Sequence, residues 1–117
     1  DYKAQSSTYP ITISSYLESE WHLSYKLQMD IYVHILRKMN FKVSNLSYFY
    51  VCNGTKTKDK FDNKIDFTTT LIPYCVDTSW IEKKLSEMKD VLNSEKVPEI
   101  EKSCEKCAYL KGGKDFF

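Results

Sequence analysis

Glycine is scarce in this chain, with three residues among 117, and so low a content favours helices and strands over a scaffold made mainly of loops. Four cysteines are few for a secreted module of this size that is held together by disulfides. No stretch has the run of about 18 apolar residues that a membrane span needs, and no signal peptide opens the sequence. These absences predict a soluble, cytoplasmic domain without a membrane partner.

A large excess of one charge is also missing, since the formal net charge is +1 at pH 7. Without a global basic field, any binding to nucleic acid has to come from a local patch or a metal site. What the chain does contain is apolar and aromatic, with 42% hydrophobic and 15% aromatic residues. That composition suits a packed core, and the length of 117 residues predicts a single domain over residues 1–117.

Residues 17–39 are predicted to form a long amphipathic helix, ended by Asn40 as its C-terminal cap. On a helical wheel, the apolar face contains Trp21, Tyr25, Gln28, Met29, Ile31, Tyr32, Ile35, Leu36 and Met39. The opposite face, expected to be in solvent, contains Lys26, Asp30, His34, Arg37 and Lys38. The apolar face is therefore expected to pack on the core.

Gln28 is an amide in the middle of this apolar face. A buried amide without a partner costs about 1–3 kcal/mol, so Gln28 requires either a structural partner or a polar cavity. A backbone group of the sheet and a functional site are both open interpretations. Tyr32 follows about 6 Å along the helix axis, and on its own it is interpreted as a core tyrosine with its hydroxyl at the edge.

The chain contains Asp1-Tyr2-Lys3, then a loop, and then a helix that carries Gln28-x-x-x-Tyr32. This order of motifs resembles the RecB-type branch of the PD-(D/E)XK nuclease superfamily, which includes CRISPR-associated and phage exonucleases. The resemblance implies an α/β (α+β) restriction-endonuclease-like core, with a mixed central sheet flanked by helices. It implies that Asp1 is a metal ligand and that Lys3 is the lysine that orients or polarises the attacking water. Gln28 and Tyr32 would reach back to the site and to the DNA backbone.

The function implied by the resemblance is a Mg²⁺- or Mn²⁺-dependent deoxyribonuclease in DNA recombination, repair or the processing of phage and mobile-element DNA. Its implied partners are DNA and a helicase or other recombination subunit. The chemistry is consistent, because carboxylates that hold Mg²⁺ activate water and neutralise phosphate charge, and a lysine adds a fixed positive charge. Oxygen ligands also suit Mg²⁺ better than Zn²⁺.

The family places another acid on the strand before Asp-x-Lys, and nothing precedes Asp1 in this sequence. We therefore expect the chain to be the C-terminal portion of the nuclease domain, inactive in isolation, with the remaining ligands upstream. One alternative is a catalytically incomplete α/β module that binds nucleic acid or protein. Another is an unrelated α+β domain with a CxxC redox or zinc motif.

Two strands are predicted next, over residues 43–52 and 65–76, as an antiparallel hairpin. The first is expected to be covered on both faces, and Pro73 predicts a sheet edge for the second. Asn53-Gly54 is interpreted as a turn before a charged loop over residues 55–64. Lys56, Lys58 and Lys60 of this loop are candidate phosphate contacts, although a solvated hairpin tip is the favoured interpretation.

A packing helix is predicted from about Ile81 to Asn93, followed by a tail over residues 94–117 with Cys104-x-x-Cys107. In several RecB-type nucleases, cysteines near this end hold an iron–sulfur cluster, which needs four thiolates. Here Cys104 and Cys107 have ligand spacing, whereas Cys52 and Cys75 are expected to be core residues of the strands. The pair is therefore a candidate remnant of a metal or iron–sulfur site, and no intact cluster is expected.

Overall fold

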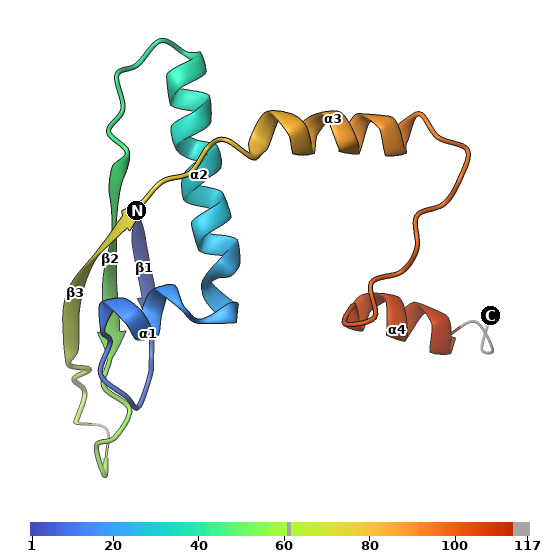
Figure 1. Cartoon of the computed structure of the whole chain (residues 1–117). Coiled ribbons are helices and arrows are strands. Elements are labelled where there is room, and N and C mark those ends of the chain that lie inside the picture. Colours follow the sequence, from blue (N-terminus) through green and yellow to red (C-terminus); the bar gives the residue numbers. More distant parts are fainter. Residues whose placement is uncertain (61, 114–117) are drawn as a thin grey trace. The chain divides into compact units, whose positions relative to one another are not determined.

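The computed structural model describes residues 1–60 and 62–113. In chain order the elements are β1 (Tyr2–Gln5), α1 (Ile13–Leu17), a short 3-10 helix η1 (Glu20–His22), α2 (Leu23–Lys38), β2 (Leu46–Gly54), β3 (Phe67–Cys75), α3 (Ile81–Leu92) and α4 (Glu105–Gly113) (Figure 1). The chain divides into two compact units, Asp1–Ile81 and Glu82–Phe117, and each is described by itself.

The first unit contains a mixed sheet with the strand order β1-β2-β3. β1 runs parallel to β2, with Lys3 opposite Val51, and β2 runs antiparallel to β3. The two parallel strands need a crossover connection, and α1, η1 and α2 provide it. The expected hairpin is confirmed, and so is the edge position that Pro73 predicted for its second strand, because β3 pairs with β2 alone in this sheet.

The core lies on one face of the sheet. It contains Tyr16 from α1, Met29 from α2, Phe49 and Val51 from β2, and Ile72 from β3. Alternate residues of a strand point to opposite faces, so the neighbours of Phe49 in β2 point away from the helices. These neighbours, Tyr48 and Tyr50, are 43% and 38% exposed. The expectation that this strand is covered on both faces is therefore wrong within the described residues.

The predicted turn at Asn53-Gly54 is also wrong, because β2 continues through both residues. Gly54 pairs with Phe67 at the end of the hairpin ladder, and a Cβ atom at Gly54 would lie 3.3 Å from the Phe67 ring. The Asn53 side chain bridges to the loop after β1: its Oδ1 accepts from the Ser7 amide at 2.7 Å, and its Nδ2 donates to the Ser7 carbonyl at 3.2 Å. The link between β2 and β3 lies further on, between Gly54 and Phe67.

The predicted helix over residues 17–39 is divided among α1, η1 and α2. Its end is as expected, since Asn40 adopts a left-handed conformation with φ of 67°. The Asn40 amide donates to the Arg37 carbonyl at 2.9 Å, and the Phe41 amide donates to the Leu36 carbonyl at 3.0 Å. These two bonds form the Schellman motif that commonly ends a helix.

The face of α2 that packs on the sheet differs from the predicted face. Met29, Asp30 and Val33 are the buried residues of α2. Trp21 in η1, by contrast, is 89% exposed, and Ile35 in α2 is 48% exposed. The buried face is therefore rotated by roughly a third of a turn from the apolar face of the helical wheel. The prediction fails because it places a charged residue, Asp30, in solvent, whereas the fold buries that residue.

Three hydrogen bonds compensate for the burial of Asp30, which is 3% exposed. The Tyr74 hydroxyl donates to it at 3.0 Å, the Asp77 amide at 3.1 Å and the Trp80 indole Nε1 at 3.0 Å. Hydrogen bonds to an ionised carboxylate are stronger than neutral ones. Asp30 therefore joins the middle of α2 to the end of β3 and to the segment before α3.

The second unit contains most of α3, together with α4, which the sequence did not predict. The bounds of α3 agree with the predicted packing helix. Cys104 and Cys107 are joined by a disulfide at the start of α4.

Across residues 1–60 and 62–113, none of the helices has both the length and the apolar character that crossing a bilayer requires.

Replacing Asp30 with alanine is expected to lower the free energy of unfolding of the first unit by about 3 kcal/mol, because three donors lose their buried acceptor. Asp59→Ala is the matched control, since Asp59 belongs to the same unit and is exposed. Urea unfolding followed by circular dichroism measures both variants. Equal stabilities of the two variants would contradict the structural role assigned to Asp30.

Tyr16 and Tyr74 are expected to ionise at a higher pH than an ordinary tyrosine phenol. Burial raises the pKa of the Tyr16 phenol from 10.0 to about 12, and its hydroxyl has no hydrogen-bond partner within the described part of the chain. Burial, followed by the hydrogen bond to Asp30, raises the pKa of Tyr74 to about 12. A raised folded-state pKa favours the protonated phenol, so this contribution to stability is complete below pH 10 and is lost as the pH rises toward 12.

A spectrophotometric titration of tyrosinate, combined with urea unfolding at each pH, tests this expectation. Stability should fall across that alkaline range, and the fall should be smaller in Tyr74→Phe. The same decline in Tyr74→Phe as in the parent protein would show that Tyr74 does not contribute to it.

Candidate functional site

The ammonium group of Lys3 has three neighbours on the helix-covered face of the sheet. Its Nζ donates to Gln28 Oε1 at 2.8 Å and lies 3.0 Å from Asp1 Oδ2. It also lies 4.2 Å from the centre of the Tyr25 ring, within the range of a cation–π interaction. The side chains of Lys3 and Asp1 are 15% and 25% exposed, so the group is sheltered but still open to solvent. Lys3 is therefore a fixed positive charge at the boundary between β1 and α2.

Backbone pairing explains why Asp1 and Lys3 share this face. The Tyr50 amide donates to the Asp1 carbonyl at 2.8 Å, so the ladder between β1 and β2 begins at Asp1. Residues two apart in a strand point to the same side, and Val51, the partner of Lys3, is buried in the core together with Met29 of α2. Asp1 and Lys3 thus lie at the beginning of β1, which is an edge strand of the described sheet.

Gln28 and Tyr25 lie one turn apart on α2 and both contact Lys3. The expectation that the Gln28 side chain points toward Asp1 and Lys3 is confirmed. Its Oε1 bonds to a side chain, so the structure does not support the alternative in which Gln28 bonds a backbone group of the sheet. Gln28 is half-buried, and the Lys3 ammonium is the partner that its amide required.

Tyr32 does not share the described contacts of this group. It is 46% exposed, which also contradicts the interpretation of Tyr32 as a core tyrosine. The structure therefore brings together Asp1, Lys3 and Gln28 and leaves Tyr32 facing solvent one turn further along α2. Sequence reasoning missed Tyr25, although it precedes Gln28 by one helical turn and that spacing could have indicated it.

The residues near Lys3 supply one carboxylate for a metal ion, that of Asp1. Within residues 1–60 and 62–113, no group of three or more His, Cys, Asp and Glu side chains could hold a metal ion. Mg²⁺ in proteins is commonly held by one or two carboxylates, together with water and substrate phosphate. The single carboxylate of Asp1 is therefore the smallest number of protein carboxylates with which Mg²⁺ is commonly bound, and the same holds for Mn²⁺ in this site.

The cysteines do not form a ligand cluster. Cys104 and Cys107 are bonded to each other, and a sulfur in a disulfide is not the thiolate that metals bind. Cys52 is half-buried, and Cys75 is exposed, which corrects its assignment to the core.

The lysine-rich loop between β2 and β3 has its own ion pairs. Lys58 pairs with Asp66, and Lys64 Nζ lies 3.3 Å from an oxygen of the same carboxylate. The hydrogen bond from Lys58, followed by that from Lys64, lowers the pKa of Asp66. Lys56, Lys58 and Lys60 line one hollow of this loop, and their contact with DNA phosphates stays a prediction.

Comparisons of the chain with family models, with curated proteins and with solved structures found no match. The resemblance to RecB-type nucleases therefore rests on the two sequence motifs and on the contacts of Lys3 with Asp1 and Gln28.

Proposed function

We propose that the chain is part of a RecB-like, metal-dependent DNA nuclease with a restriction-endonuclease-like core. The observation that carries the proposal is the Lys3 ammonium between the Asp1 carboxylate and the Gln28 amide, at distances of 3.0 and 2.8 Å. The resemblance assigned these three residues to one site, although Gln28 is distant from the other two in sequence. The parallel pair of β1 and β2, with α2 in the connection between them, is consistent with the proposed core.

In this proposal Asp1 would hold Mg²⁺ or Mn²⁺, which when bound neutralises phosphate oxygens and makes water a better nucleophile. Lys3 contributes a positive charge that is in place before the reaction, so it stabilises charge developing on the phosphate without reorganising. Gln28 fixes the position of that charge by accepting its hydrogen bond. Tyr32, being exposed on α2, is available to contact the DNA backbone.

The partners in this proposal are DNA and a helicase or other recombination subunit. The same chain fits a second function, a catalytically incomplete α/β module that binds nucleic acid or protein. The observation that favours this second function is the single carboxylate beside Lys3, which already forms an ion pair with it. The two functions differ in whether DNA is cleaved when Mg²⁺ or Mn²⁺ is present.

Replacing Lys3 with alanine in the full encoded protein is expected to abolish DNA cleavage in Mg²⁺ or Mn²⁺, because the fixed charge beside the phosphate is lost. Cleavage of a labelled oligonucleotide, resolved on a denaturing gel, is the measurement, and EDTA should stop it in the parent protein. Lys83→Ala on α3 is the control, since the Lys83 side chain is 84% exposed. Cleavage at the parental rate by Lys3→Ala excludes the proposed site, whereas a parent protein that binds DNA without cleaving it supports the second function.

A further inference from the structure

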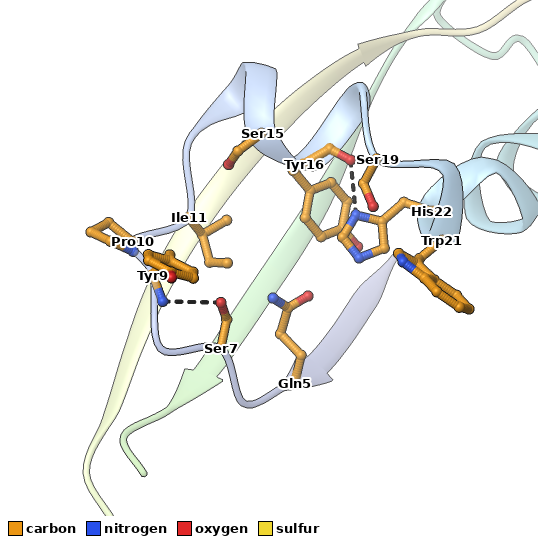
Figure 2. A pocket seen from close by; sticks show the side chains of 10 residues that line it. All are labelled: Gln5, Ser7, Tyr9, Pro10, Ile11, Ser15, Tyr16, Ser19, Trp21 and His22. Carbon is orange, nitrogen blue, oxygen red and sulfur yellow. Dashed lines mark hydrogen bonds between the residues drawn. The ribbon is translucent and has the colours of Figure 1, made fainter. Parts of the chain in front are cut away.

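A hollow of about 410 Å³ lies beside the Lys3 site in the first unit. It is lined by residues from the end of β1, the loop that follows, α1 and η1 (Figure 2). These residues are Gln5, Ser7, Tyr9, Pro10, Ile11, Ser15, Tyr16, Ser19, Trp21 and His22. The proposed nuclease reaction uses none of them.

Hydrogen bonds to β2 hold the wall of this hollow in place. The amide of Ser7 donates to Asn53 Oδ1 at 2.7 Å, and Asn53 Nδ2 donates back to the Ser7 carbonyl at 3.2 Å. The Ser6 hydroxyl donates to the Gly54 carbonyl at 2.9 Å, and the Tyr9 amide donates to Ser7 Oγ at 3.2 Å. The loop is thus tied to the sheet, so the hollow belongs to the fold.

Two aromatic rings of the lining are exposed almost completely, Tyr9 at 79% and Trp21 at 89%. Both rings line the same hollow, whose lining combines apolar surface with polar side chains, and flat π faces are what unpaired bases stack on. Figure 2 shows both rings together with the polar side chains of Gln5 and Ser19. The lining therefore combines stacking surfaces with hydrogen-bonding groups.

His22 adds a ring nitrogen with a defined role. Its Nδ1 lies 2.8 Å from the Tyr16 carbonyl oxygen, which can only accept, so Nδ1 carries the proton. In the neutral imidazole, Nε2 is then a hydrogen-bond acceptor. The Gln5 amide both donates and accepts, and so does the Ser19 hydroxyl. Nucleobase edges present mixed donors and acceptors of the kind that these groups satisfy.

Two residues of the lining, Gln5 and His22, link the hollow to the Lys3 site. Gln5 follows Lys3 by two residues in β1, so both side chains are on the same face, about 7 Å apart along the strand. The His22 ring stacks on Tyr25 with 5.4 Å between the ring centres, and Lys3 Nζ lies 4.2 Å from the Tyr25 ring centre. A nucleotide whose base occupies the hollow would therefore have its phosphate near a positive charge.

We propose that this hollow binds an unstacked base of single-stranded DNA and thereby positions the adjoining phosphate at Lys3. That the ligand is DNA rests on the proposed function, and the hollow adds a preference for single-stranded over double-stranded DNA. A base inside a duplex is stacked on both faces, so it cannot enter a hollow flanked by Tyr9 and Trp21. The site accordingly selects single strands, frayed ends or strands that a partner has already separated.

The test is a binding titration of the full encoded protein with labelled oligothymidylate, followed by fluorescence anisotropy in EDTA so that no strand is cleaved. Trp21→Ala and Tyr9→Ala should each raise the Kd roughly 5- to 150-fold, the range measured when a stacking ring is removed. Both side chains are exposed, so neither change removes core packing. Tyr109→Ala is the matched control, because Tyr109 lies on α4 and is 80% exposed.

The same oligothymidylate annealed to oligodeoxyadenylate should bind more weakly than the free strand. Three results would overturn the proposal: no measurable binding of the single strand, an unchanged Kd in both variants, or an equal loss in Tyr109→Ala. The nuclease proposal is judged separately, by cleavage in Mg²⁺ or Mn²⁺. If Trp21→Ala and Tyr9→Ala weaken binding but no DNA is cleaved, the base site is supported and the nuclease proposal is excluded. If cleavage depends on Lys3 but binding is unchanged in both variants, the nuclease proposal is supported and the base site is excluded.

Discussion

The buried carboxylate of Asp30 determines how α2 lies on the sheet. Its three hydrogen bonds come from Tyr74 in β3 and from Asp77 and Trp80 in the segment that follows. A buried acceptor with three donors cannot turn toward solvent without leaving those donors unpaired, so the rotation of α2 about its axis is fixed. The flank of α2 that carries Tyr25 and Gln28 then faces β1. The position of the Lys3 ammonium therefore depends on hydrogen bonds made elsewhere in the unit.

The proposed site is an assembly of local and distant contributions. Asp1 and Lys3 share a face because a strand alternates, which is a local property of three residues. Gln28 and Tyr25 come from the crossover helix, and Asn53 of β2 holds the loop that shapes the neighbouring hollow. One face of a small sheet thus carries a fixed charge at one end of β1 and a group of exposed rings beside the other.

Part of this arrangement could be predicted from the sequence. Alternating residues indicated both strands of the hairpin, Pro73 indicated an edge, and Asn40 indicated the end of α2, because each of these signals is local. An amide on an apolar face indicated only that Gln28 needs a polar partner, and the resemblance implied that this partner lies at Asp1 and Lys3. The structure supplies the partner in the Lys3 ammonium.

The rest depended on contacts between distant residues. The helical wheel placed Asp30 in solvent, since hydropathy does not register donors contributed by Tyr74 and Trp80. Asn53-Gly54 was read as a turn because its side-chain bonds to Ser7 are invisible in the local sequence. The hollow between Tyr9 and Trp21 was missed for the same reason, because it exists only when the loop after β1 is tied to β2.

The order in which the strands come together bears on the proposed site. β2 and β3 are neighbours in sequence, whereas β1 pairs Tyr2 with Tyr50 and must wait for the whole crossover to close. Closing a longer loop costs more chain entropy, and non-local pairing slows folding. We expect β1, a strand of four residues, to dock last and to detach first. A molecule with β1 detached would retain its hairpin and much of its helix content, yet Lys3 would be far from Gln28, so the proposed site exists only after the final step of assembly.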